Sequence, residues 1–202
     1  CWTSLALAAE WTERLEIGPM VSPMTFRLPS VLAKIAATVD SLSGGRLILG
    51  LGAGWNENEH AVYGIPFLTQ RQRFDLLEQA LKTMPEIWAK TNPKPARDPI
   101  PILMGGRGAK RTLPLAAKYA AEWNLSRLDV DEFRERSAIL DGCCRDIGRD
   151  PKTIKRSVMT SYIIGRTRAD QLERAALVRE VIPSLSAMSP DARPRRVAAT
   201  CG

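Results

Sequence analysis

Strand-length apolar runs alternate with amphipathic helical patterns along this chain, and that alternation limits the fold more than any other feature. The run "RLILGLG" (46–52) has almost no polar interruption, as is typical of a buried strand in a parallel sheet. The segment 71–88 has helical periodicity instead, with Phe74, Leu77, Leu81, Met84 and Trp88 on one stripe. Strands that alternate with helices predict βαβ units, and hence an α/β fold with a parallel sheet.

The remaining segments extend the pattern in both directions. Further helices are expected at 2–14, 29–42, 110–121, 133–147 and 169–180, and further strands at 15–21, 99–106, 121–125 and 157–165. The helix at 29–42 is expected to carry Val31, Ile35, Val39 and Leu42 in register, and the segment "WNENEHAVYGIPF" (55–67) to be a loop. We expect a single domain over residues 1–202, with a Pro- and Arg-rich disordered tail at 183–202.

Two architectures fit this alternation, an open doubly wound sheet and a (β/α)₈ barrel. A dinucleotide-binding fold would require G-x-G-x-x-G between a strand and its helix. Here Gly50 and Gly52 are followed three places later by Trp55, and no acidic residue closes a following strand about 20 residues on. The glycines therefore argue against a nucleotide fingerprint, and from spacing alone they fit tight turns and close approach of a cofactor equally well.

Net charge, hydropathy and cysteine content indicate which partners and which cellular compartment to expect. The net charge of +7 is spread along 202 residues with no run of Lys and Arg, so we expect no nucleic-acid partner. No apolar run approaches the ~20 residues of a membrane span, and no basic-then-apolar leader precedes the first residue, so we expect a cytoplasmic protein without membrane contact. Four cysteines without C-x-x-C spacing and one histidine predict reduced thiols and no metal site.

Several long motifs resemble one family. They are "FRLPSVLAKIAATVDSLSGGRLILGLGAGWNENEHAVYGIPF", "RFDLLEQAL", "PILMGGRGAKRTLPLAAKYAAEWN" and "GRDP", in that order. Over about residues 1–165 the chain resembles the bacterial luciferase-like superfamily, and most closely its coenzyme F420-dependent oxidoreductases. The resemblance implies a TIM-type (β/α)₈ barrel. It also implies an incomplete one, without the first two strands and the last, because a full barrel usually takes ~250 residues.

By resemblance, the first two expected strand ends border a flavin-type ring. The region of Met20 and Val21 would face the ring through a strained backbone, often a non-proline cis peptide. Gly52 and Gly54 would let the cofactor pass close to the backbone, and Asn58 would hydrogen-bond its ring or linker. Read without the resemblance, the first of these segments is a plain strand end before a turn.

The strongest physical signal for a bound anion lies in "MGGRGAKRTL" (104–113). Its candidate binding residues are Gly105, Gly106, Arg107 and Gly108. These residues lead into an expected helix N-terminus, where free amides and the helix dipole attract anions, and Lys110 and Arg111 add positive charge. The alternative is a glycine turn with solvated basic residues. The resemblance places the cofactor phosphate here.

Three of the other candidates, Trp55, Trp123 and His60, have two interpretations. Trp55 either walls a pocket or caps the core, and Glu59 is expected to orient neighbouring groups. Trp123 either packs or borders the site, and by resemblance Asn124 faces the cavity. His60 is a general-acid candidate near neutral pH, although an isolated histidine is more often structural.

The resemblance implies an oxidoreductase that transfers hydride between coenzyme F420 and an unidentified small organic substrate. Two alternatives stay open: an FMN-dependent luciferase-like monooxygenase, and an inactive barrel fragment without catalysis. The cofactor would supply the chemistry and the protein its position and electrostatics. Family members often pair, so a homodimer is a further expectation.

Overall fold

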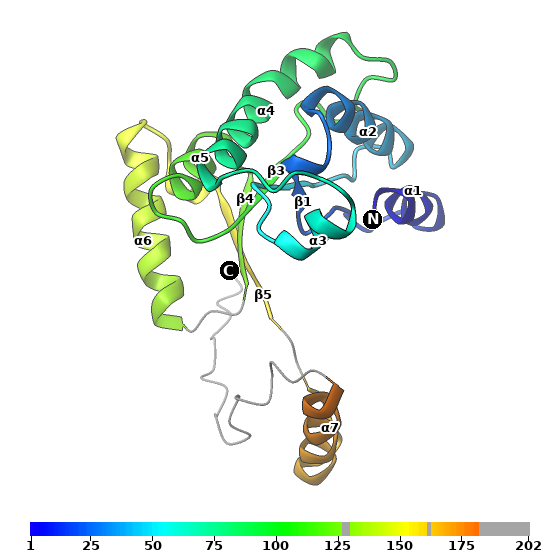
Figure 1. The fold of residues 1–202 in the computed structure, drawn as a ribbon, viewed down its shortest axis with the longest axis vertical. Coiled ribbons are helices and arrows are strands. Elements are labelled where there is room, and N and C mark those ends of the chain that lie inside the picture. The colour runs from blue at the N-terminus through cyan, green and yellow to red at the C-terminus, as the bar shows by residue number, and fades with distance from the viewer. Residues whose placement is uncertain (127–129, 161–162, 182–202) are drawn as a thin grey trace.

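The computed structural model describes residues 1–126, 130–160 and 163–181, so the expected tail at 183–202 lies outside the described residues. Helices and strands alternate as the sequence predicts (Figure 1). The elements are α1 (Trp2–Trp11), β1 (Ser22–Pro23), η1 (Met24–Phe26), α2 (Pro29–Leu42), β2 (Leu49–Gly52), α3 (Glu57–Val62), α4 (Gln70–Lys90), β3 (Ile102–Gly105), α5 (Thr112–Tyr119), β4 (Glu122–Ser126), α6 (Val130–Asp146), η2 (Pro151–Thr153), β5 (Lys155–Met159) and α7 (Arg168–Val181).

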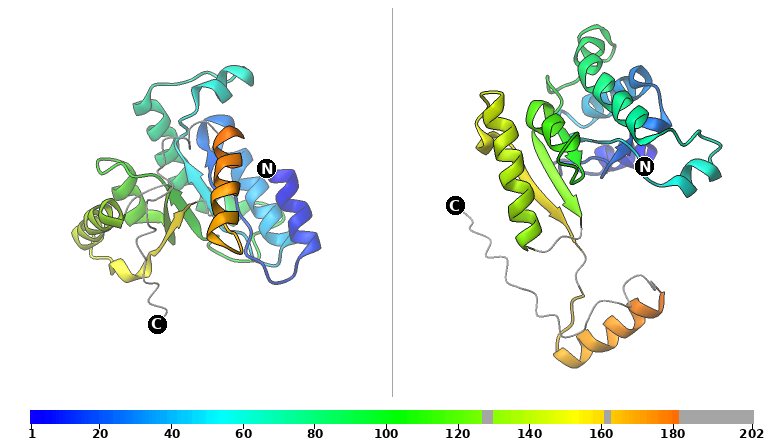
Figure 2. Two further views of the ribbon diagram at one scale, coloured as in Figure 1. Left: turned by 90° about the horizontal axis from the view of Figure 1, so that it is seen from below. Right: turned by 60° about the vertical axis from the view of Figure 1, so that its left-hand side comes forward.

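The sheet has five strands in the order β1-β2-β3-β4-β5, and every neighbouring pair is parallel. This consecutive order belongs to a barrel wall and excludes the doubly wound alternative, in which the strand order reverses at a switch point. Within the described residues β1 and β5 do not pair, so the barrel is open, as expected for an incomplete one. Helix α7 lies apart from the other helices (Figures 1 and 2).

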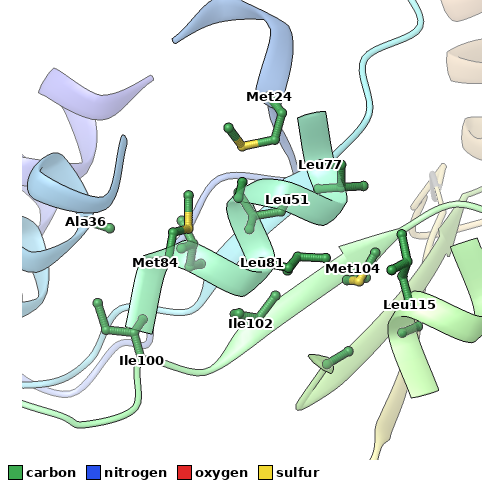
Figure 3. Close-up of a cluster of buried hydrophobic side chains, with 14 of the residues drawn as sticks. Met24, Ala36, Leu51, Leu77, Leu81, Met84, Ile100, Ile102, Met104 and Leu115 are labelled. Atoms are coloured by element: carbon green, nitrogen blue, oxygen red, sulfur yellow. The ribbon is translucent and has the colours of Figure 1, made fainter. Parts of the chain in front are cut away.

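The core lies between the sheet and the helices that cover it, and Figure 3 shows the part of it around α4. The buried residues of α4 are Leu77, Ala80, Leu81, Met84 and Trp88. The predicted stripe is confirmed, and Figure 3 shows Leu81 close to Ile102 and Met104 of β3. A helix of this length gains most of its stability from packing such a face, which places α4 firmly over β2 and β3.

The predicted face of α2 is wrong in part. Val31 and Leu42 are exposed, and the buried face consists of Leu32, Ala33, Ala36, Ala37, Val39 and Asp40. The alanines allow α2 and α4 to approach closely, and the Trp88 indole N–H donates to the Ala33 carbonyl at 3.1 Å. A contact between two helix backbones favours the small-residue face over the more apolar one.

Two other expectations need correction. Residues 15–21 do not form a strand; Ile17 makes a single parallel bridge to Leu47, and β1 begins only at Ser22. Pro19 interrupts the ladder because it has no N–H to donate. The segment 55–67 is not entirely a loop, because α3 forms within it, with the Asn56 side chain accepting from the Glu59 amide at 3.3 Å. That asparagine cap was the missed signal.

A buried carboxylate ties together the amino-terminal ends of the strands. Asp40 is fully buried at the end of α2 and accepts hydrogen bonds from the amides of Leu47 (3.3 Å) and Arg97 (2.8 Å). The Arg97 guanidinium returns a bond to the Leu47 carbonyl at 2.7 Å. The segment before β3 is thereby held beside the segment before β2.

Arg46 extends this network to the first helix. Its guanidinium donates to the carbonyls of Ala9 (2.7 Å) and Leu15 (3.1 Å) and to the Thr12 hydroxyl at 2.9 Å. Arg46 therefore fixes the C-terminal end of α1 against the start of β2. The D-x-x-S-G-G-R motif thus acts at the end of the barrel opposite the strand carboxyl ends, where side chains contribute to stability.

We expect Asp40→Ala to lower the free energy of unfolding by about 2–4 kcal/mol, because two amide donors lose their acceptor. Urea denaturation followed by circular dichroism measures this change. The matched control is Asp98→Ala, an exposed aspartate in the same loop as Arg97; it should shift stability by less than about 0.5 kcal/mol. Equal effects of the two variants would contradict the assigned role of Asp40.

Candidate functional site

A cavity of about 910 Å³ opens at the carboxyl-terminal ends of the strands. Every strand contributes to it, either directly or through the loop beside it. Its lining includes Met20, Val21, Pro23, Gly52, Gly54, Asn56, Glu59, Arg73, Gly105, Gly106, Arg107, Gly108, Asn124, Ser126 and Met159. In a barrel of parallel strands this is the end where ligand sites collect.

The floor of the cavity is built from one valine between two glycines. A Cβ on Gly52 would lie 2.7 Å from Cγ2 of Val21, and one on Gly105 would lie 3.2 Å from Cγ1 of the same side chain. No side chain is tolerated at Gly52 unless Val21 shifts. The Met20–Val21 peptide is cis, as the resemblance implied. The ring-facing role of these residues stays a prediction.

The glycine turn after β3 lines the cavity with Gly106, Arg107 and Gly108. The Gly106 amide bonds to the Asn124 carbonyl at 3.2 Å, whereas the amides from Arg107 to Lys110 have no hydrogen-bond partner among the described residues. Helix α5 begins just beyond, at Thr112. A turn with several free N–H groups beside a helix N-terminus is suited to an anion.

Of the three basic residues in this segment, Arg107 alone is among the lining residues. It pairs with Glu132 at 3.2 Å and remains 54% exposed. Arg111 instead pairs with Asp75 (2.8 Å) and Glu78 (3.3 Å) on α4. The structure thus corrects the expectation of three clustered charges.

Of the two carboxylates that bind Arg111, Glu78 is held in the ionised form. The hydrogen bond and charge of Lys82, with a smaller contribution from Arg111, lower the pKa of Glu78 below its usual value. The same contact raises the pKa of Lys82. Arg111 therefore links the start of α5 to α4 through ion pairs.

Some residues of the segment after β2 line the cavity and others do not. Trp55 lines it with 83% of its surface exposed, so Trp55 does not cap the core. Asn58 is exposed on α3 and is not among the lining residues, whereas Asn56 and Glu59 are. The structure thus brings the predicted glycines to the site but not Asn58. Glu59 is the one carboxylate among the described lining residues.

His60 is buried and its ring nitrogens are both engaged. Nδ1 lies 2.7 Å from the Asn56 carbonyl oxygen, which can only accept, so Nδ1 carries a proton. Nε2 lies 2.8 Å from the Thr25 hydroxyl. Phe26 and Phe67 contact the ring edge-on at centroid distances of 5.0 and 4.9 Å. This environment is that of a structural histidine joining α3 to η1.

Arg73 is a site residue that the sequence analysis missed. Its guanidinium donates to the carbonyls of Gly54 (3.1 Å) and Leu68, and it lies over the Phe67 ring at 4.1 Å. Arg73 therefore holds the loop after β2 against the start of α4. Its position one residue before the predicted stripe residue Phe74 was the available signal.

The two candidates at the end of β4 have different roles. Trp123 is fully buried, donates its indole N–H to the Gly106 carbonyl at 2.9 Å and stacks on Phe133. Trp123 therefore packs and supports the glycine turn. Asn124 lines the cavity, as the resemblance implied.

Other chemistries find little support in the described part of the chain. No group of three or more His, Cys, Asp and Glu residues there is placed to hold a metal. Burial raises the pKa of the Cys143 and Cys144 thiols above the usual value, which disfavours the reactive thiolate. The described helices include none with the length and apolarity needed to cross a bilayer.

The family model for luciferase-like monooxygenases matches residues 1–199. The chain belongs to this family. It is 30% identical over 165 residues to an uncharacterized protein of Mycobacterium tuberculosis, covering 74% of this chain and 57% of that protein. It is 35% identical over 128 residues to the F420-dependent glucose-6-phosphate dehydrogenase of Amycolatopsis mediterranei, covering 55% of this chain and 37% of the enzyme.

Two solved structures share the fold. The coenzyme F420-dependent tetrahydromethanopterin reductase of Methanopyrus kandleri superposes with a TM-score of 0.74 at 20% identity, over 89% of this chain and 60% of that one. A monooxygenase from Streptomyces bottropensis also has a TM-score of 0.74, at 19% identity, over 92% and 61%. The luciferase-like chain described here thus spans about six-tenths of these TIM-barrel enzymes.

We expect His60→Ala to lower the free energy of unfolding by about 2–3 kcal/mol, because two buried hydrogen bonds and two ring contacts are lost. Thermal and urea denaturation measure it. Asn58→Ala is the control on the same helix and should change stability by less than about 0.5 kcal/mol. A destabilisation by Asn58→Ala as large as that by His60→Ala would contradict this interpretation.

Proposed function

We propose that this chain is the cofactor-binding part of a luciferase-like oxidoreductase that transfers hydride between coenzyme F420 and a small organic substrate. One observation carries the proposal: a cavity at the strand carboxyl ends combines a glycine-lined floor with a turn of free amides. Relatives named as F420-dependent enzymes support the choice of cofactor. When bound, the deazaflavin would supply the hydride chemistry.

The residues present fit both the ring and the phosphate of a flavin-type cofactor. Val21 fills the space that side chains at Gly52 and Gly105 would occupy, and the three residues together form an apolar floor that suits a flat ring. The turn of Gly106, Arg107 and Gly108 offers donors and positive charge to a phosphate. Aromatic and basic groups at the rim, Trp55 and Arg107, are placed to cover a ligand and limit water.

Few side chains in this cavity could donate a proton to a bound substrate or accept one from it. His60 also lines the cavity, but both its ring nitrogens are engaged by Asn56 and Thr25, so we propose a structural role for it in place of general-acid catalysis. Glu59 lines the cavity with a side chain for which no hydrogen bond or ion pair is found among the described residues. We assign Glu59 as the chain's own proton donor or acceptor toward a bound substrate.

An anion site at the turn of Gly106, Arg107 and Gly108 predicts a loss of affinity that is selective for phosphorylated ligands. Arg107→Ala should weaken FMN binding about tenfold and leave riboflavin, the same ring without phosphate, nearly unchanged, because a charged hydrogen bond is worth roughly 1.5 kcal/mol or more. Fluorescence quenching measures both dissociation constants. Arg111→Ala serves as the control, since Arg111 is bound to Asp75 and Glu78. Equal losses for FMN and riboflavin would place the phosphate elsewhere.

An FMN-dependent monooxygenase is the second candidate, because the family model that matches the chain is that of luciferase-like monooxygenases. Titration with coenzyme F420 and FMN under the same conditions separates the two. We expect tighter binding of F420; tight FMN binding without F420 binding rejects hydride transfer to a deazaflavin. If neither flavin binds, the chain is an inactive barrel fragment, or its cavity needs strands beyond the described residues.

A further inference from the structure

Three polar side chains form a hydrogen-bonded row across β4 and β5. Glu122 and Asn124 are two residues apart on β4, so they point to the same face of the sheet. Ser157 on β5 pairs in register with Asn124. The Ser157 hydroxyl bridges them, bonding to the Glu122 carboxylate and lying 2.7 Å from the side-chain amide of Asn124. The row begins at the buried Glu122 and ends in the cavity.

The direction of each bond in this row is fixed by elementary chemistry. Lys155 lies 3.1 Å from Oε2 of Glu122, so the carboxylate is paired with an ammonium group and can only accept. The single hydroxyl proton of Ser157 must therefore point to Glu122. Ser157 can then only accept from Asn124, which places the Nδ2 group of Asn124 against the hydroxyl and turns Oδ1 away from it.

We propose that Glu122, acting through Ser157, sets the carboxamide of Asn124 so that Oδ1 faces the cavity as a hydrogen-bond acceptor. Oδ1 has no hydrogen-bond partner among the described residues, although Asn124 is 6% exposed and lines the cavity. The ligand group at this position must then be a donor. Resting on the proposed function, we assign that donor as the ring N–H of the flavin-type cofactor, because N3–H is the one N–H of an oxidised isoalloxazine ring. Asn124 is the contact residue, and Glu122 and Ser157 are positioning residues.

Glu122→Gln is the sharpest test because it should reverse the row. Lys155 keeps the Gln oxygen on its own side, so the Gln NH₂ faces Ser157 and donates to it. The Ser157 proton then turns to Asn124, whose carboxamide flips to accept, and Nδ2 faces the cavity. Ser157→Ala removes the bridge and leaves Asn124 without a preferred orientation. The control is Glu86→Gln, an exposed residue of α4.

NMR of the ligand-free ¹⁵N-labelled protein reads the orientation directly. In the parent protein we expect nuclear Overhauser contacts between the Asn124 side-chain NH₂ and the Ser157 β-protons, with slow exchange of those NH₂ protons. Glu122→Gln should abolish the contacts and speed the exchange, Ser157→Ala should speed the exchange, and Glu86→Gln should change neither. Contacts that persist in Glu122→Gln would overturn the proposed positioning.

Ligand discrimination tests the contact itself. The parent protein should bind FMN about tenfold more tightly than 3-methyl-FMN, which lacks the N3 proton, and the ratio should fall toward one in Ser157→Ala and Glu122→Gln. A ratio that is the same in parent and variants would overturn the assigned donor. If neither compound binds the parent protein, the assigned contact to FMN fails, the titration with coenzyme F420 decides the proposed function, and the NMR comparison still decides whether Glu122 orients Asn124.

Discussion

The parallel, consecutive pairing of five strands is the constraint on which the rest of this molecule depends. Since all strands run in one direction, their carboxyl ends meet at one edge, and the segments that follow them surround one cavity. The pairing also brings β1, β2 and β3 close enough for Val21 to lie between Gly52 and Gly105. A shift of register between these strands would remove the floor of the cavity, because Val21 would meet residues with side chains.

Stability and function are assigned to opposite ends of this sheet. At the amino ends, Asp40 and Arg46 satisfy backbone groups from segments far apart in sequence and leave little freedom to move. At the carboxyl ends, backbone amides between Arg107 and Lys110 lack partners within the described residues. These amides lie in a mostly exposed turn beside the cavity, where they are available to a ligand.

The site is also organised by residues that do not themselves need to touch a ligand. Arg73 joins the loop after β2 to α4, and Trp123 supports the turn after β3 through the Gly106 carbonyl. Glu122 and Ser157 act in the same way on Asn124, because the direction of their hydrogen bonds orients its side-chain amide. In each case a buried or half-buried side chain fixes the position of a backbone or amide group at the cavity.

The sequence by itself determined the element order, the parallel sheet and the strand ends that carry the site. Local periodicity was sufficient to predict α4, whose Leu77–Trp88 stripe is buried as predicted, because a continuous apolar stripe of that length is stable only when it packs against the core. Gly52, Gly105, Gly106 and Gly108 were also expected at the site, and they line the cavity. The sequence motifs further identified the family, and with it the likeness to a barrel, because such motifs retain the geometry of strand ends.

Only the tertiary structure decided which side chains share the cavity and how they are oriented. Leu42 is exposed while Ala36 is buried, because α2 packs on α4 through its small residues. Lys110 and Arg111 were expected beside Arg107, yet Arg111 is drawn to α4 by two carboxylates. The link between Glu122, Ser157 and Asn124 crosses two strands and has no local signature. Such pairings depend on which segments meet in space, and residue spacing along a chain does not contain that information.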